Sequence, residues 1–225
     1  MKRVLFLLSI TLLISCNDSK SNIDFITAVS GYYWFNSDES IKITFEENEM
    51  RVKWRGKENI KPLKVNDSTF YIQEMNEKFI FVLQPKVHIK LAAKREHKGK
   101  AYVFNKMLAS QKTPTAYFLN KEYKKALEGY LAIQEKDSLD KAIDYRTLSS
   151  YGYQLITEKK YEEAIELLKI NTQLHAKNTS TYNSLANAYL RNKDTVNAIK
   201  TYTKALSIHP ENTTSKRALK RITKK

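Results

Sequence analysis

The chain has 225 residues, of which 42% are hydrophobic and 28% are charged, and its formal net charge is +15. This length and balance suit two small globular domains, and a single cysteine excludes a disulfide within the chain. The charge alone does not indicate nucleic-acid binding, because lysines and acids are interspersed along most of the sequence.

The first sixteen residues have the pattern of a secretory signal. Residues 2–3 form a short basic start, residues 4–14 are apolar, and the small Ser15 precedes Cys16. The apolar run is too short to cross a bilayer, which takes about 20 residues, so residues 1–15 are expected to be cleaved. The alternative, an ordinary signal with a chance cysteine, would leave an unpaired thiol on an exported protein.

The same residues resemble the signal and lipobox of bacterial lipoproteins. In that family the cysteine thiol takes a diacylglyceryl group, the signal is cut just before it, and the new amino terminus is acylated, for example with palmitate. The resemblance implies that Cys16 is lipidated and that residues 16–27 form the lipidated N-terminus and a linker. Two or three acyl chains, at roughly 0.8 kcal/mol per buried methylene, hold a protein at a membrane almost permanently.

The resemblance also implies a lipid-anchored place in the bacterial cell envelope. Asn17 stands where an aspartate is associated with inner-membrane retention in some bacteria, so the outer membrane is expected, with the periplasmic and surface faces both open. Exported proteins rarely meet nucleic acid, which is a further reason to exclude that partner.

Basic residues do gather at the C-terminus. They are Lys216, Arg217, Lys220, Arg221, Lys224 and Lys225. Cations favour the carbonyl end of a terminal helix, and they also favour contact with anionic lipid headgroups. Both interpretations stay open.

Residues 28–107 are predicted to form a small antiparallel β domain. Residues 41–45 and 50–54 alternate apolar and polar side chains around a break at 47–49, which is typical of a hairpin. Further short runs rich in β-branched and aromatic residues follow, separated by turn residues. About seven or eight strands at this spacing predict a meander that is curled or closed to bury one face.

This segment resembles the small β domain that follows serine β-lactamase-like hydrolase domains in many bacterial proteins. The likeness is carried by Gly31-Tyr32-Tyr33, Pro62-Leu63, residues 67–71 and the run 79–81. It implies descent from the tail of such a hydrolase, here without the catalytic domain.

Residues 112–225 are predicted to be helical repeats. One set of large and small residues recurs at fixed spacing: Tyr182, Leu185, Ala186, Tyr189, Ala198, Tyr202, Ala205 and Pro210, preceded by Leu148, Tyr151, Gly152, Leu155, Ala164 and Leu168. The pattern resembles the tetratricopeptide repeat (TPR), whose period is 34 residues. The resemblance implies pairs of antiparallel helices, brought close by the small residues.

The array is short and its ends need covering. In the first unit Pro114 falls where a helix should be in mid-course, so that helix must start late. Residues 139–142 lengthen the next connection, and residues 213–222 are expected to cap the far end, with the β domain as a candidate cap at the other. The predicted fold class is α+β: a β meander followed by an all-α TPR array.

The TPR resemblance implies a partner-binding groove on the first helix of each pair. The residues expected to line it are Arg146, Ser149, Tyr153, Ile156, Asn183, Asn187 and Leu190. Asn183 and Asn187 lie one turn apart, so both amides could reach one peptide segment. The competing interpretation is that these residues are simply solvated polar residues on an open face.

Catalytic chemistry is not expected. Ser138 and Lys141 match the Ser-x-x-Lys nucleophile motif of β-lactamase-like enzymes, but no Lys-Thr-Gly follows and no segment could supply a hydrolase domain. The four histidines show no metal-ligand spacing, and five glycines make a phosphate loop improbable. Neither a metal nor a cofactor is predicted.

The sequence therefore favours a non-catalytic lipoprotein that holds an unidentified envelope protein or peptide in its TPR groove. A second hypothesis has the β meander hold a small apolar or sugar ligand with its aromatic residues, which include Tyr32, Tyr33, Trp34, Phe45 and Trp54. A third makes the chain an accessory subunit of an envelope hydrolase.

Overall fold

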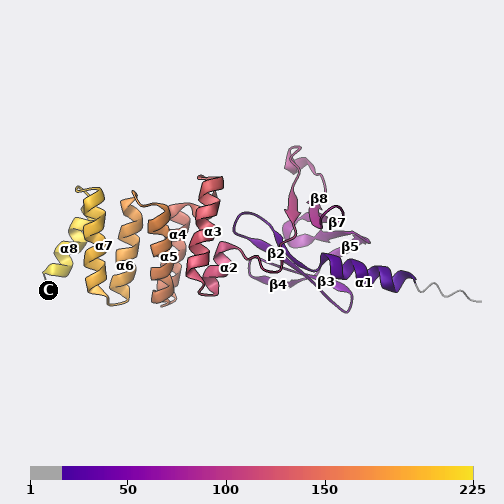
Figure 1. Cartoon of the computed structure of the whole chain (residues 1–225), viewed down its shortest axis with the longest axis horizontal. Helices are drawn as coiled ribbons and strands as arrows, with labels where there is room; N and C mark the ends of the chain where they lie inside the picture. The colour runs from indigo at the N-terminus through magenta and orange to yellow at the C-terminus, as the bar shows by residue number, and fades with distance from the viewer. Residues whose placement is uncertain (1–16, 225) are drawn as a thin grey trace, which may run out of the picture. The chain divides into compact units, whose positions relative to one another are not determined.

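The computed structural model describes residues 17–224; the predicted signal and Cys16 lie outside the described residues. The fold class is α+β, as predicted, with an antiparallel β region followed by a helical array (Figure 1). The chain divides into two compact units. The β unit holds the described residues up to Tyr33 together with Ile41–Ala109, and the helical unit holds Trp34–Ser40 together with the described residues from Ser110 onward.

The β unit is a meander of two sheets, and within each sheet every strand lies beside its neighbours in sequence. One sheet contains β1 (Gly31–Trp34), β2 (Ser40–Glu46), β3 (Glu49–Trp54) and β4 (Lys57–Ile60). The other contains β5 (Leu63–Asn66), β6 (Thr69–Ile72), β7 (Glu77–Val82), β8 (His88–Leu91) and β9 (Val103–Asn105), with the 3-10 turns η1 (Gln73–Met75) and η2 (Arg95–His97) between strands. The predicted meander is confirmed, as two sheets rather than one.

The predicted hairpin over residues 41–54 is confirmed as β2 and β3. Ile43 pairs with Val52, and the connecting Glu47 and Asn48 have φ angles of 51° and 66°. Positive φ at both central residues gives a turn whose twist matches that of the strands. The alternation then buries Ile43 and Val52 completely on one face.

The two sheets meet at the paired ends of β1 and β9. Tyr33 forms an antiparallel bridge with Lys106, and the Met107 N–H donates to the Tyr32 carbonyl at 2.8 Å. The inner faces then share a core in which Tyr33 and Phe81 make an edge-to-face contact at 6.1 Å between ring centroids. The meander is curled so that its apolar faces are buried.

Residues 17–29 form a helix, α1 (Asn17–Val29), where a linker over 16–27 was expected. The Phe25 ring stacks on Phe70 at 6.4 Å and meets Phe81 edge-on at 5.9 Å, while Val29 is completely buried. The Lys106 ammonium donates to the Ala28 carbonyl at 2.5 Å, which satisfies an acceptor at the end of the helix. The linker interpretation is therefore corrected: apolar residues at helical spacing dock this segment on the sheet.

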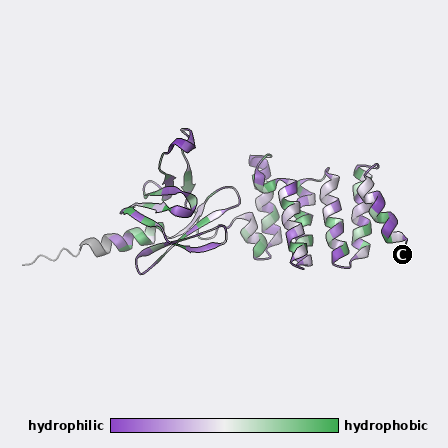
Figure 2. Ribbon diagram, turned by 180° about the vertical axis from the view of Figure 1, so that it is seen from behind, coloured by the Kyte–Doolittle hydropathy of each residue, from purple (hydrophilic) through white to green (hydrophobic). Residues whose placement is uncertain are grey.

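The helical unit consists of helix pairs and a terminal helix. The first helices are α2 (Pro114–Leu119), α4 (Tyr145–Thr157) and α6 (Thr179–Arg191), the second helices are α3 (Tyr123–Lys136), α5 (Tyr161–Leu174) and α7 (Thr195–Ile208), and α8 (Thr213–Thr223) ends the array. The turn η3 (Lys141–Ile143) lies in the lengthened connection that was predicted. Figure 2 shows hydrophobic and hydrophilic residues mixed along each helix of this unit, as expected for helices buried on one side.

The small and large residues of the repeat pattern pack the helices against one another as the TPR resemblance predicts. Helix α4 packs beside both α5 and α6, and α3 packs beside α5, so first helices neighbour first helices and second helices neighbour second helices. A Cβ atom placed on Gly152 would lie 2.8 Å from the Leu168 side chain, so only glycine allows this approach of α4 to α5. Ala164 and Ala198 are completely buried at the equivalent positions of successive units.

The late start of the first helix is also confirmed. Helix α2 begins at Pro114, and the Thr113 hydroxyl caps it by accepting from the Ala116 N–H at 3.1 Å. A loop from before the β2 strand completes this end of the helical unit. The Asp38 carboxylate accepts from the backbone and side chain of Thr115 at 2.7 and 2.6 Å. Residues 34–40, which the sequence interpretation assigned to the β domain, therefore pack with the helices.

Among the described residues, none of the helices is long and apolar enough to cross a bilayer.

Candidate functional site

Two of the predicted groove residues, Ser149 and Asn183, form hydrogen bonds with other helices of the helical unit. Asn171 is completely buried on α5, at a position where the repeat pattern has alanine, and its amide donates to the Ser149 hydroxyl and to the Tyr145 carbonyl, both at 3.0 Å. The Ser184 hydroxyl of α6 lies 3.5 Å from Ser149. Ser149 therefore joins α4 to α5 and α6, and its contact with a ligand stays a prediction.

Asn183 is likewise committed within the unit. Its amide donates to the Asn212 side-chain oxygen at 3.3 Å, and its own oxygen accepts from the completely buried Ser215 hydroxyl at 2.7 Å. Asn212 in turn caps α8 by accepting from the Ser215 N–H. In this structure the Asn183 amide bonds to residues at the start of α8, and the expectation that Asn183 and Asn187 present two amides to one ligand stays a prediction.

The remaining predicted groove residues have three different roles. Ile156 and Leu190 are half-buried and pack against the hydrophobic clusters of the array. Arg146 is exposed, and its guanidinium lies 4.8 Å from the centroid of the Tyr145 ring. Tyr153 is 42% exposed, so it is free to contact a partner.

Asn187 lines a hollow of about 520 Å³ at the end of the array. The hollow is formed by α6, α7 and α8, and its lining residues are Asn187, Arg191, Tyr202, Thr214, Arg217, Ala218 and Arg221. We call this hollow the basic pocket. Arg217 and Arg221 lie four residues apart on α8, so they share a face of that helix, while Arg191 ends α6.

The charged residues that line the basic pocket are all positive. Of its described lining residues, three are arginines and none is acidic, and neither α6 nor α8 contains an acidic residue. Arginine stays protonated at every physiological pH. The pocket therefore carries three uncompensated positive charges around neutral hydrogen-bonding groups.

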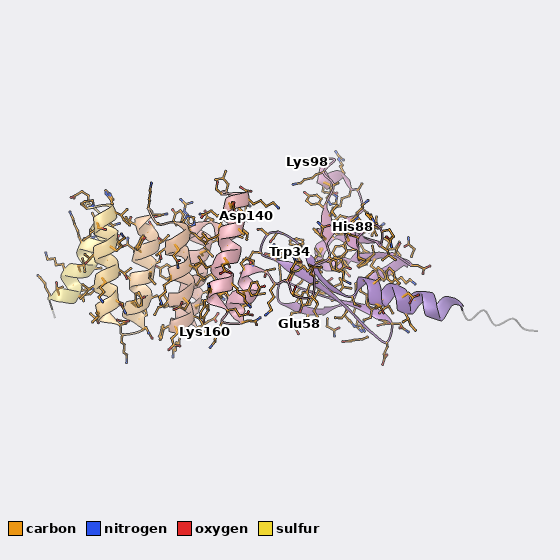
Figure 3. The ribbon with its side chains drawn as sticks, viewed as in Figure 1. Trp34, Glu58, His88, Lys98, Asp140 and Lys160 are labelled. Atoms are coloured by element: carbon orange, nitrogen blue, oxygen red, sulfur yellow. The ribbon has the colours of Figure 1, made fainter. Side chains whose placement is uncertain are left out.

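Two other hollows of the described chain contain both basic and acidic residues. One, in the helical unit, is lined by Lys121 and Lys160 together with Glu158 and Glu163. The other, in the β unit, sets Lys42, Arg51 and Lys53 against Glu46 and Glu58. Figure 3 labels Lys160 and Glu58, one from each of them. The charge imbalance of the basic pocket is therefore not a general property of hollows in this basic protein.

Tyr202 connects the basic pocket to the predicted groove. It is 5% exposed, and burial raises the pKa of its phenol; the Tyr153 phenol adds to that rise and the Arg221 guanidinium opposes it. Tyr153 of α4 and Arg221 of α8 therefore both lie close enough to Tyr202 to affect its ionisation. Tyr202 therefore lines the basic pocket and also interacts electrostatically with the exposed Tyr153 of α4.

The 34-residue period of the sequence could have identified two of the three arginines as residues of the binding face. Arg217 and Arg221 follow Asn183 and Asn187 by 34 residues, so they occupy the same repeat positions on the next first-type helix. Their clustering with lysines was recognised only as a basic terminus. Arg191, one turn after Asn187, was missed as well.

The residues of the Ser-x-x-Lys motif lie outside the lining of the basic pocket. Ser138 is exposed in the turn after α3, and Asp140 (labelled in Figure 3) uses its carboxylate to cap η3 by accepting from the Ala142 N–H. Within residues 17–224, no three His, Cys, Asp or Glu side chains gather as a metal site requires.

Comparisons with known proteins gave structural likenesses only. No protein-family model matches the chain, and no curated protein matches it. Among solved structures, the second TPR domain of human RPAP3 in complex with the HSP70 peptide SGPTIEEVD is 19% identical, with a TM-score of 0.35 over 50% of this chain and 90% of that one. The Arabidopsis OM64 TPR domain is 19% identical, with a TM-score of 0.34 over 49% of this chain and 88% of that one.

A third likeness is to the Sgt2 TPR domain from Aspergillus fumigatus, which is 21% identical with a TM-score of 0.35 over 49% of this chain and 72% of that one. The TPR-like nature of the helical unit rests on the 34-residue pattern and on the packing of first and second helices described above.

Proposed function

We propose that this protein binds an extended segment of a partner protein on the face of its first helices, and that a lipid on Cys16 holds it at a bacterial envelope membrane while it does so. The observation that carries the binding role is an open hollow lined by three helices, with Asn187 from α6, Tyr202 from α7 and Arg221 from α8. Tyr153 of α4 is exposed, and its phenol contributes to the raised pKa of Tyr202.

The chemistry of that region suits a peptide. Asn187 offers an amide with a donor and an acceptor, which can pair with an extended backbone. Tyr153 offers an exposed ring whose burial would contribute apolar area and whose hydroxyl can still hydrogen-bond. Large aromatic residues and arginines are the side chains that dominate binding at protein interfaces.

The β unit is proposed to act as a spacer or second contact surface rather than as a ligand site. Of the aromatic residues considered for a small ligand, Tyr33 is completely buried against Phe81. Phe25 of α1 contacts both Phe70 and Phe81. These rings fill the curled meander with the protein's own side chains.

Site-specific photo-crosslinking in intact cells tests the binding role. Replacing Tyr153 by a photoreactive phenylalanine is expected to give discrete crosslinked species that the same group at Thr203 does not give, because Thr203 is exposed on α7 and does not line the region. Equal crosslinking from both positions would contradict the proposed binding face.

Metabolic labelling tests the anchor separately. A palmitate analogue is expected to label the wild-type chain and to leave a Cys16→Ser variant unlabelled, with the unlabelled variant released from the membrane fraction. A Cys16→Ser variant that stays in the membrane fraction would show that something other than lipid holds the protein there.

A further inference from the structure

We propose that the β unit itself binds anionic phospholipid headgroups, through the outward face of β7, β8 and β9 and the loop between β8 and β9. We call this surface the cationic face. The inference goes beyond the proposed function, in which only a lipid on Cys16 holds the protein at the membrane.

The first argument is the concentration of positive charge in this part of the chain. Residues 86–106, which hold β8, the loop and β9, contain seven lysines and arginines and a single acidic residue, Glu96. The whole chain has 39 basic and 24 acidic residues, so the excess of positive charge is concentrated here. Cations that lie within a Debye length of anionic headgroups are attracted to them.

The second argument is that the protein leaves these cations open to a ligand. Lys86, Lys90, Arg95 and Lys98 are all exposed, and none of them has an ion-pair partner among the described residues. Many other surface lysines of the described chain do have one; Lys53, for example, pairs with Glu58. The four cations are therefore available to an external anion.

The third argument is that the loop is held in place at its base. The Lys94 ammonium donates to the Glu77 carboxylate at 2.6 Å and to the Asn76 carbonyl at 2.7 Å. The His97 ring lies 3.0 Å from the same carboxylate and meets the Tyr102 ring edge-on at 5.1 Å. Figure 1 shows the loop projecting from the β unit, and Lys98 is labelled near its far end in Figure 3. The loop thus presents its cations without having to order first.

The strands beside the loop present lysine and aliphatic side chains together. Ile89 and Phe104 are buried on the inner side, so the alternation of the strands turns Lys90 and Val103 outward. The register places Lys90 between Ile80 and Val103, and Val103 is 46% exposed. No outward position of β7, β8 or β9 carries an acidic side chain. Lysine stems and aliphatic groups can lie at headgroup level while the ammonium groups meet phosphate oxygens.

The place of this surface in the chain favours a bilayer over an acidic protein. Helix α1 begins one residue after Cys16 and is docked on the β unit through Phe25 and Val29. The unit that the proposed lipid would tether is therefore the unit that carries the cationic face. Tethering raises the local concentration of headgroups around that face, so even a modest affinity would give contact.

Vesicle co-sedimentation tests the inference, with the chain taken from Asn17 onward. This length keeps both compact units and every described element. It removes the predicted signal and Cys16, so neither can hold the protein to a bilayer. Vesicles that contain phosphatidylglycerol should bind the chain roughly tenfold more tightly than pure phosphatidylcholine vesicles, and the difference should shrink as salt rises.

Lys90→Gln/Arg95→Gln/Lys98→Gln should remove most of the binding to phosphatidylglycerol vesicles. Each cation near an anionic surface contributes about a fivefold change in binding, so three losses exceed the whole expected preference. Binding that survives this triple change would overturn the inference.

The matched control takes two lysines and one arginine from the other basic cluster of the chain. Lys220→Gln/Arg221→Gln/Lys224→Gln changes exposed residues at the C-terminus, and it should bind as the unchanged chain does. Equal weakening by the two triple variants would show that binding follows net charge instead of the cationic face, and would overturn the inference.

A dye on the outward strands tests whether the face itself meets the bilayer. From Asn17 onward the chain has no cysteine, so Val103→Cys provides a single site for an environment-sensitive dye. Its emission should shift to the blue on phosphatidylglycerol vesicles, whereas a dye on Lys57→Cys, exposed on β4 of the other sheet, should not shift. An unshifted dye at residue 103 on bound protein contradicts the inference.

Absence of any preference for phosphatidylglycerol also overturns the inference, and it is the outcome expected if the cationic face binds an acidic protein. That result would leave the proposed function standing, because the vesicle experiment contains neither a lipid on Cys16 nor a peptide partner.

Discussion

The phenol of Tyr130 donates a hydrogen bond of 3.1 Å to the carboxylate of Asp38, although the two residues are 92 positions apart in the chain. The same carboxylate accepts two hydrogen bonds from Thr115, at the first turn of α2. A loop that precedes β2 thus completes the end of the helical array where the first helix starts late.

Replacing Asp38 by asparagine should destabilise the helical unit. The asparagine oxygen can still accept one hydrogen bond, but its amide group would face the donors of Thr115 or Tyr130. Leaving buried donors unpaired costs about 1–3 kcal/mol. Urea unfolding followed by circular dichroism measures the loss. Asp24→Asn is the control, because Asp24 is exposed on α1, and a similar effect of both changes would contradict the role given to Asp38.

The same carboxylate should contribute to the pH dependence of stability. Burial raises the pKa of Asp38, and the hydrogen bonds from Thr115 and Tyr130 oppose the rise without cancelling it. The folded state therefore holds this proton more tightly than the unfolded chain does. The resulting stability is fully present below the unfolded pKa, about 3.9, and is lost as pH rises through the higher folded pKa.

The pH prediction is checked by comparing urea unfolding of the wild type and Asp38→Asn across this acidic range. The difference between their free energies of unfolding should change with pH in the range just above 3.9, and should be constant at neutral pH. A difference that stays constant throughout would show that Asp38 titrates normally.

Gly152→Ala should destabilise the contact between α4 and α5. The added methyl group would lie 2.8 Å from the Leu168 side chain, and overpacking of this kind costs about 1–3 kcal/mol. A lower thermal unfolding temperature is the expected result. Ser150→Ala, at an exposed position of the same helix, controls for helix propensity and should leave the unfolding temperature nearly unchanged.

Asn183→Ala should release α8 rather than remove a ligand contact. The change removes two hydrogen bonds, to Asn212 and Ser215, so amide hydrogen exchange within Thr213–Thr223 should accelerate while the exchange of α4 and α5 stays as it was. Asn187 makes neither of these hydrogen bonds, so Asn187→Ala should leave the exchange of α8 unchanged. Unchanged protection of α8 in Asn183→Ala would show that the network does not hold the helix.

The sequence predicted the features that repeat or alternate. The hairpin of β2 and β3 followed from period-two alternation around Glu47 and Asn48, and the helix pairs followed from small and large residues at a 34-residue spacing. These patterns are local or periodic, and each position has the same reason for its residue type. Pro114 even indicated where the first helix begins.

The contacts that the sequence did not predict join segments far apart in the chain. Nothing near Asp38 indicates that its partners are Thr115 and Tyr130. The sequence places Asn183 on an open helix face, and it does not show that Ser215 of α8 donates a hydrogen bond to the Asn183 side chain. The sequence shows that basic residues cluster near the C-terminus. It does not show that Arg217 and Arg221 line the basic pocket while the lysines of α8 do not, because this depends on how α8 packs.

Helix α1 begins at Asn17, and the β unit holds its last turns through Phe25, Val29 and the Lys106 ammonium. Its 13 residues rise roughly 20 Å at about 1.5 Å per residue. If Cys16 carries a lipid, as proposed, the segment between the lipid and the β unit is a helix rather than an extended tether. The distance over which the β unit could move away from the bilayer is then limited by the length of α1, because a helix rises only about 1.5 Å per residue.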